Sequence, residues 1–367
     1  MNRELETMDL SKESIMNRVI YLIFSLALIC LASEMYAGNP DRQGEAGAPE
    51  LLMNPWARSA GLHTMTTSMI SGVEAMRLNP AGLARIRKTE IVLGNALYLR
   101  GTDINMNAVG IATKVGKSGA FGLSLMALDI GDIQVTTTAQ PEGNGSTFSP
   151  RIFNLGLSYA NVFENKVSVG ATFRAVSQSI SNASASAIAL DAGVQYVTGE
   201  QDNFKFGISL RNIGSRMQFK GEGLDFDAQV NEGAGTYGIL TSQRADDFEL
   251  QSVLNIGASY DVLFGKKTRL TLVGNYTSNA FSQDQIGGGV EFAFNELVMV
   301  RGGYKLDFGQ TANGGLEEPL YTGPAAGVTL NVPVNKKEDA PRIGIDYAYR
   351  TTKIYDGTHN ISVRINL

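Results

Sequence analysis

The sequence predicts an all-β fold, a 14-stranded antiparallel transmembrane β-barrel with a short N-terminal helical plug segment. Three observations predict it: segments of alternating apolar and polar residues, long connections that all fall on one side, and charged residues opposite the apolar face. The composition agrees, with 41 glycines among 367 residues and only 18% charged residues. A membrane barrel has such a composition because its apolar residues occupy alternate positions and do not form long runs.

The first 37 residues have the features of a secretory signal peptide. An apolar stretch at 19–32 is about fourteen residues long, too short for a membrane helix, and follows the positively charged Arg18. Ala37 offers a cleavage site, and either Met1 or Met16 is the start of the leader. Lipid attachment at Cys30 is disfavoured because Ile29 occupies a position that needs a small residue. We therefore expect export and removal of residues 1–37.

Residues 38–88 form the next predicted region, a linker followed by a plug or hatch segment. Residues 38–50 are rich in Gly, Pro and charged residues and are expected to be linker. Met65, Met69 and Met76 then recur at roughly helical spacing, which predicts one short helix and a turn. These methionines are candidates to line a plug or a pocket, although such a stripe is more often packing surface.

Residues 89–367 are predicted to form the barrel. The last segment shows the period-2 pattern best, with Ile361, Val363 and Ile365 on one face and Ser362 and Arg364 on the other. We expect Val363 to face lipid and Ser362 to face a wet lumen, where a new charge is better tolerated. The predicted strands are 89–100, 103–115, 118–130, 151–163, 166–180, 185–198, 203–215, 248–263, 266–278, 284–294, 297–309, 322–332, 341–350 and 358–367.

The connections predict the orientation of the barrel. The three longest, 131–150, 216–247 and 310–321, all follow odd-numbered strands, so they emerge on one side of an up-and-down barrel. Most connections on the other side are tight turns, with 333–340 as an exception. Long loops outside and short turns inside are typical of the outer membrane. Aromatic residues gather near the short turns, as expected at a membrane interface: Phe163, Tyr196, Phe204, Phe264 and Phe294.

The face opposite the apolar one carries charges of both signs. A small soluble barrel has to bury one face and would not fill it with charges, whereas a membrane barrel has a polar lumen. We expect these residues to form a lumen charge network, paired through water or with each other. The predicted members are Glu90, Arg174, Asp191, Arg211, Glu291, Arg301, Lys305, Asp307, Arg342, Asp346 and Arg364.

Several functional classes are excluded or disfavoured. The net charge of −5 without a basic patch gives no indication of nucleic-acid binding. One cysteine and two histidines, His63 and His359, are too few for a cysteine or histidine metal site, so no metal or cofactor is predicted. Gly287-Gly288-Gly289 lies within a strand and lacks the context of a phosphate loop, so it marks a bend, a bulge or a close backbone contact. We expect a protein that is not an enzyme.

The motif Asn79-Pro80-Ala81-Gly82 precedes the first strand. Asn-Pro ends the predicted helix, and Gly82 permits a backbone turn into the barrel. In this context the segment resembles the FadL superfamily of outer-membrane barrels, in which an NPAG turn belongs to a plug or hatch inside the barrel. With ARSAG at 57–61 and DYAY at 346–349, the chain is most similar to the PorV/PorQ family within that superfamily.

The resemblance leaves two functions open. Similarity to the PorV/PorQ family implies an outer-membrane partner of type IX secretion that carries cargo from the translocon or assists its attachment at the surface. Such a protein would dock its translocon or cargo on the long loops 131–150 and 216–247. Similarity to FadL implies instead transport of long-chain fatty acids or other hydrophobic molecules, through a pocket that Met65, Met69 and Met76 would line.

Overall fold

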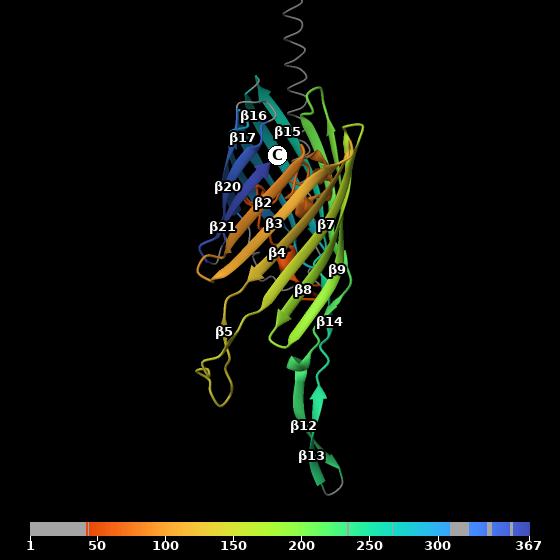
Figure 1. The fold of residues 1–367 in the computed structure, drawn as a ribbon, viewed down its shortest axis with the longest axis vertical. Helices are drawn as coiled ribbons and strands as arrows, with labels where there is room; N and C mark the ends of the chain where they lie inside the picture. Colours follow the sequence, from red (N-terminus) through yellow and green to blue (C-terminus); the bar gives the residue numbers. More distant parts are fainter. Residues whose placement is uncertain are drawn as a thin grey trace, which may run out of the picture. The chain divides into compact units, whose positions relative to one another are not determined.

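A computed structural model of the chain describes residue 42 and residues 44–232, 235–265, 267–308, 323–335, 340–352 and 355–367. The predicted signal peptide, 1–37, and the predicted connection 310–321 lie outside the described residues. Among the described residues, fourteen antiparallel strands close into one barrel, in which the first strand pairs with the last (Figure 1). The predicted fold class is therefore confirmed.

Each barrel strand overlaps a predicted one. The bounds are β2 (Thr89–Tyr98), β3 (Ile104–Val115), β4 (Gly119–Asp129), β7 (Arg151–Phe163), β8 (Val167–Ile180), β9 (Ala183–Thr198), β10 (Phe204–Gly214), β15 (Val253–Phe264), β16 (Thr268–Asn279), β17 (Asp284–Phe294), β18 (Val298–Phe308), β19 (Gly323–Pro333), β20 (Arg342–Arg350) and β21 (Thr358–Asn366). The predicted strand 248–263 is in fact two elements, because β14 (Asp247–Leu250) leaves the barrel wall and only β15 lies within it.

Burial alternates along the wall as the period-2 pattern requires. Every second residue of β9 is buried, and in β21 Val363 is exposed while Ser362 and Arg364 are buried. The predicted faces of the last strand are thus confirmed. The five aromatic residues predicted near the short turns are all exposed on the outer surface. An apolar outer surface with aromatic residues at one end is the surface that a bilayer covers.

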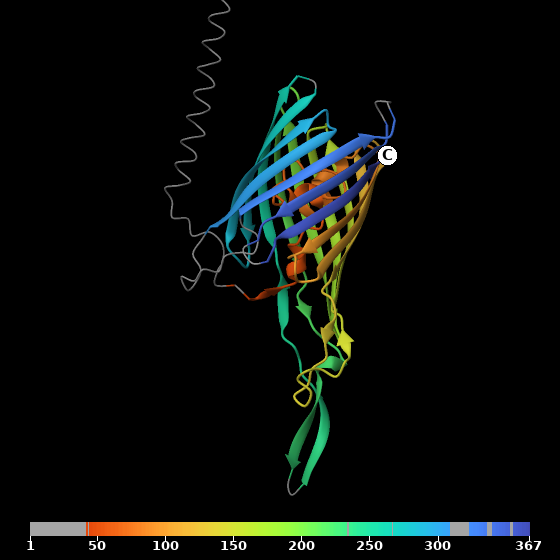
Figure 2. The same ribbon diagram turned by 90° about the vertical axis from the view of Figure 1, so that its left-hand side faces the viewer.

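The two ends of the barrel differ (Figures 1 and 2). Tight turns join the strands at one end, whereas the two long connections that the structure describes both project from the other. Connection 131–150 carries the short strands β5 (Ile133–Gln134) and β6 (Thr147–Phe148). We call these the short-turn end and the long-loop end.

Connection 216–247, predicted as a long loop, has ordered elements of its own. It contains β11 (Met217–Gln218), the 3-10 turn η4 (Glu222–Leu224) and a hairpin of β12 (Asp225–Glu232) and β13 (Gly235–Ser242). The hairpin projects beyond the barrel (Figure 2). Its strands form because Phe226, Ala228 and Val230 alternate with polar residues, a pattern that the length of the connection obscured.

The N-terminal segment runs inside the barrel from the long-loop end to the short-turn end (Figure 2). It consists of β1 (Ala46–Gly47), η2 (Pro49–Leu51), α2 (Ala57–Ala60), α3 (Ala75–Leu78) and η3 (Pro80–Arg85). β1 pairs with β14 at the long-loop end, and Arg85 donates a hydrogen bond to the Lys166 carbonyl in a short turn. We call residues 46–85 the plug. Because β1 and η2 are ordered, 46–50 is part of the plug and not linker.

The predicted helix at the methionines was largely wrong. Only the four residues of α3 are helical there, and Met65 and Met69 lie in turns. His63, Thr64 and Gly72 adopt positive φ angles of 51°, 64° and 80°, which interrupt a right-handed helix. No helix in the described part of the chain is long and apolar enough to cross a membrane.

Candidate functional site: the plugged lumen and the outer hairpin

Glycines of the barrel wall allow the plug to lie directly against it. A Cβ atom added at Gly122 would lie 2.3 Å from Met76 Sδ, and one added at Gly287 would lie 2.3 Å from Met65 Sδ, closer than real Cβ contacts. The same holds, each against a plug residue, for Gly94, Gly110, Gly170, Gly193, Gly207, Gly289 and Gly303. Of the three alternatives predicted for this glycine run, a bend, a bulge or a close backbone contact, close contact holds at Gly287 and Gly289. Much of the glycine in the strands therefore makes room for the plug.

The Asn79-Pro80-Ala81-Gly82 turn sits against β8 and β9. Asn79 is fully buried; its Nδ2 donates to the carbonyls of Thr67 (2.8 Å) and Val194 (3.1 Å), and its Oδ1 accepts from the Ala81 N–H (3.2 Å). Asn79 therefore ties the plug both to itself and to the wall, and the helix ends just before it, as predicted.

Gly82 has another role than the predicted turn. It lies within η3 without a positive φ angle, and an added Cβ would lie 2.1 Å from the Ile70 carbonyl oxygen. Glycine is needed there for close packing within the plug, not for a left-handed backbone.

One group of predicted lumen charges surrounds the middle of the plug. Arg174 pairs with Asp191, and both are buried. The second Asp191 oxygen accepts from the Asn212 N–H at 2.7 Å. Arg211 donates to the carbonyl of Arg77 in the plug at 2.7 Å. These wall charges thus bind each other and the plug backbone.

A second group lies across the lumen. Glu291 accepts from Arg301 (2.9 Å) and from Arg269 (3.1 Å), and all three side chains are largely buried. Arg301 also reaches the carbonyl of Arg58 in the plug at 3.3 Å. Asp346 accepts from Arg364 at 3.3 Å. Direct contacts account for these pairs, so the expected wet lumen is instead filled by protein at these positions.

Four predicted members lie elsewhere in the barrel. Glu90 accepts a hydrogen bond from the Val73 N–H of the plug at 2.7 Å. Asp307 accepts from Gln285, which in turn accepts from Lys305, and all three side chains are half-buried. Arg342 lies at the short-turn rim and donates to the Glu296 carbonyl, so its place in a lumen network was wrong. Arg342 is the first residue of β20, so it lies at the edge of the barrel wall.

The prediction missed buried charges of the plug itself. Glu74 accepts from the Ser59 N–H (3.0 Å) and hydroxyl (2.6 Å). Burial raises the pKa of the Glu74 carboxyl, and the nearby Asp346 raises it further. Arg77 donates to the Met53 carbonyl, and burial lowers its pKa, as do Arg174 and Arg211 nearby. The sequence carried one signal of these buried charges, namely that Glu74 and Arg77 occur within an otherwise apolar segment.

The three methionines do not form one stripe. Met65 and Met69 pack with Leu62 and Val273, whereas Met76 belongs to a separate cluster with Trp56 and Val73. A cavity beside Trp56 and Met76, also lined by the unpaired Asn154, has a volume of about 10 Å³. It has room for about one water molecule and not for a small-molecule ligand.

The N-terminal end of the plug is joined to the base of the hairpin. β1, β14 and β11 form a three-stranded sheet, and Leu51 of the plug packs with Met217 and Leu250 of the hairpin base. Glu249 pairs with Arg42 (3.2 Å) and with Arg216 (3.0 Å) at the exposed edge. The hairpin therefore rises from a packed base and not from a free loop.

One face of the hairpin is apolar and exposed. Phe226, Ala228 and Val230 pair across the strands with Thr241, Ile239 and Tyr237. Phe226, Tyr237 and Ile239 are 49%, 47% and 41% exposed. β12 and β13 form a sheet of two strands, so each has one edge without a partner strand in the described part of the chain. Open edges and exposed apolar side chains are features that proteins usually cover.

No group of three or more His, Cys, Asp or Glu residues that could hold a metal ion occurs among the residues that the structure describes. The sites with recognisable geometry are therefore a filled lumen, an anchored plug and an exposed hairpin.

Comparisons with known proteins agree with this picture. The family described as type IX secretion system membrane protein PorP/SprF matches residues 74–365. The P. putida toluene transporter TodX has a similar structure, with 12% identity and a TM-score of 0.51 over 85% of this chain and 96% of that chain. The CymD monoaromatic hydrocarbon channel has 14% identity and a TM-score of 0.52 over the same shares. Identities this low indicate a shared fold alone. No curated protein matches the sequence.

Proposed function

Because the chain belongs to the PorP/SprF family of type IX secretion system membrane proteins, we propose that it is a non-enzymatic, partner-binding component of protein secretion. It is a membrane β-barrel of the outer-membrane type. The observation that carries the proposal is the hairpin β12–β13, which presents an apolar face and two open edges beyond the barrel.

The hairpin offers two kinds of contact to a protein partner. An extended segment of the partner can add to the free edge of β12 or β13 through backbone hydrogen bonds. The face formed by Phe226, Ile239 and Tyr237 then buries partner side chains. The packed base holds both in one place, so less conformational entropy is lost on binding than with a flexible loop.

The finer role proposed is that of the PorV/PorQ type. In that role the protein receives a secreted cargo protein at the translocon, or assists its attachment at the cell surface. The long-loop end is then the cell-surface side, as the positions of the long connections predict. The leader at residues 1–37, which lies outside the described residues, would direct export.

The rival function is FadL-type transport of long-chain fatty acids or other hydrophobic molecules. Transport needs a pocket or a path, and small-molecule pockets usually have about 300–1,000 Å³. The cavity beside Trp56 and Met76 has about 10 Å³, and the wall glycines named above lie in close contact with the plug. Transport would therefore require displacement of the plug, so we rank it second.

Co-purification of tagged protein from native membranes tests the proposal. We expect secretion-system or cargo proteins to co-purify with the wild type and to be lost with Phe226→Ser plus Ile239→Ser. The matched control is Asp227→Ser plus Gln229→Ser, which alters the opposite face of the hairpin on β12. Equal recovery with both double variants would contradict a partner site on the apolar face.

A further inference from the structure

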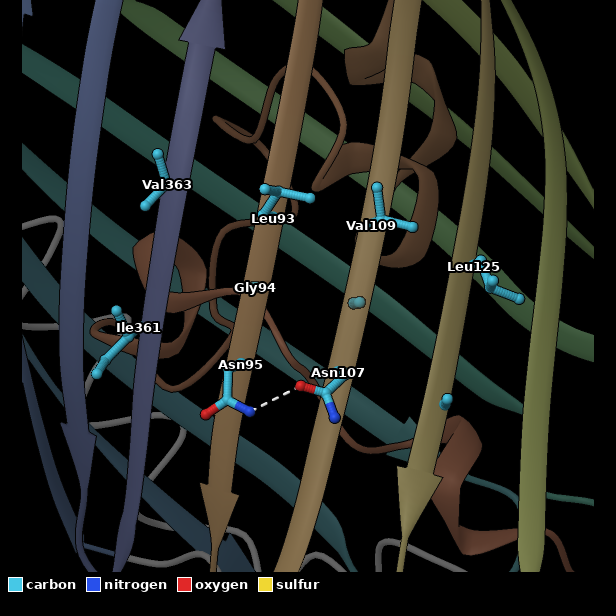
Figure 3. Close-up of a pocket in the computed structure, with 10 residues that line it drawn as sticks. Leu93, Gly94, Asn95, Asn107, Val109, Leu125, Ile361 and Val363 are labelled. Carbon is cyan, nitrogen blue, oxygen red and sulfur yellow. Dashed lines mark hydrogen bonds between the residues drawn. The ribbon is translucent and has the colours of Figure 1, made fainter.

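The outer surface of the barrel has a groove over β21, β2, β3 and β4 (Figure 3). Its volume is about 470 Å³. Leu93, Val109, Leu125 and Val363 border it on one side, and Ile361 lies at one end. Asn95, Asn107 and Ala127 form the row of shorter side chains beside them, and this row makes the groove.

Two amides lie in this otherwise apolar groove. Asn95 and Asn107 are directly opposite each other on β2 and β3, and Asn95 Nδ2 donates to Asn107 Oδ1 at 2.8 Å (Figure 3). Their neighbours in the same row are Ile361 and Ala127, which offer no side-chain hydrogen bond. The outer face of a membrane barrel contacts lipid, where an amide left without a partner is unfavourable.

The pair leaves one carbonyl oxygen and one amino group without a partner. Asn95 Oδ1 and the Nδ2 amino group of Asn107 have no hydrogen-bond partner within the described part of the chain. Exchanging oxygen and nitrogen in both amides gives the same result, one free acceptor oxygen and one free amino group. A ligand that satisfies both has to carry a donor and an acceptor.

Neighbouring side chains indicate how deep the Asn95–Asn107 pair lies in the membrane. Tyr347 is paired with Ile361 in the same row, and its hydroxyl lies 2.8 Å from His359 Nδ1, with Tyr349 beside that ring. Tyrosines are typical of the membrane interface. From the long-loop side inward, the order is therefore an aromatic and histidine cluster, then the amides, then Leu93, Val109 and Leu125.

We propose that this groove binds an amide-linked lipid of the membrane. The acyl chain lies along Leu93, Val109 and Leu125, its amide carbonyl accepts from Asn107 Nδ2, and its amide N–H donates to Asn95 Oδ1. An ester-linked lipid supplies only the carbonyl and leaves the Asn95 acceptor unpaired. The groove thus selects the amide linkage, independently of what the hairpin binds.

Native mass spectrometry of the purified barrel tests the selectivity, with C16 ceramide and dipalmitoylglycerol as probes. Both are neutral two-chain lipids, but only ceramide has an amide. We expect wild type to retain ceramide about fivefold over dipalmitoylglycerol, the factor that one net hydrogen bond supplies. Asn95→Leu plus Asn107→Leu should abolish the preference while leaving the heat-modifiable gel migration of a folded barrel.

The matched control is Ser177→Leu plus Ser186→Leu, another outward polar pair that faces across β8 and β9. It should keep the ceramide preference. Equal retention of the two lipids by wild type, or a preference that persists without the asparagines, would overturn the proposal. So would a dimer that only the asparagine variant loses, because the groove would then bind a second copy of the chain.

Discussion

The plug and the hairpin differ in which side chains they bury and which they expose. The plug buries charges, Glu74 and Arg77 among them, and both of these side chains hydrogen-bond to other plug residues. The hairpin exposes apolar residues, Phe226 and Ile239 among them, on a face that no other part of the described chain covers. Satisfied buried charges indicate a fixed, structural part, whereas exposed apolar residues indicate a surface that meets a partner.

Removal of the plug should have the largest effect. Deleting residues 51–78 removes most of what fills the lumen, and we expect an ion-conducting pore in planar bilayers where the intact protein conducts little. The barrel itself should still form, because the fourteen strands pair with one another and not through the plug. An intact protein that already conducts like an open porin would contradict the description of the plug as fixed.

A buried ion pair of the barrel wall and an exposed ion pair at the hairpin base should contribute very differently to the free energy of unfolding. Arg301→Ala leaves Glu291 buried without its closest partner, so the free energy of unfolding should fall by about 3–5 kcal/mol. Arg216→Ala breaks the exposed pair with Glu249 at the hairpin base and should leave the free energy of unfolding almost unchanged, because water screens the pair. Urea titration followed by fluorescence of Trp56, the single tryptophan and a buried plug residue, measures both. Similar losses would mean that the lumen is wetter than described.

A charge introduced on the outer face of β21 should disturb the contact with lipid, whereas one on the inner face should disturb the contact with the plug. Val363→Arg faces lipid and should cost about 2–4 kcal/mol near the bilayer midplane, and less near an interface. Ser362 accepts a hydrogen bond from the Ala57 N–H of the plug at 3.0 Å, so it faces the plug and not the wet lumen that was expected. Ser362→Arg should cost about 1–3 kcal/mol by overpacking and should expose Trp56 to a soluble quencher. Val363→Arg should leave that quenching unchanged. If Val363→Arg exposed Trp56 and Ser362→Arg did not, the register of β21 would be wrong by one residue.

The smallest effect on stability should come from the hairpin face. Phe226→Ser and Ile239→Ser change exposed side chains, so each should alter the free energy of unfolding by less than about 0.5 kcal/mol. A loss of several kcal/mol in the same Trp56 titration would show that this face packs on the barrel and is not free to bind.

The strands were predictable from sequence because a wall between lipid and a polar face imposes strict alternation, as at Ser362 and Val363. The conformation of the plug was not, because the spacing of Met65, Met69 and Met76 contains no information on the positive φ angles at His63 and Thr64. The lumen contacts depend on residues far apart in sequence, such as Glu90 with Val73 and Arg301 with Arg58. Glycines at inward positions, such as Gly122 and Gly287, were the available sign of a tightly seated plug.

The measurement that tests the account most directly is the surface proteome of a strain whose hairpin residues 226–241 are replaced by Asn-Gly. Asp225 and Ser242 are paired, so Asn-Gly closes the shortened hairpin, and the base with β1 and β14 is untouched. We expect secreted proteins to be lost from the cell surface while Trp56 fluorescence and plug closure stay normal. An unchanged surface proteome, together with impaired uptake of long-chain lipids or hydrocarbons, would contradict the secretion role and favour transport.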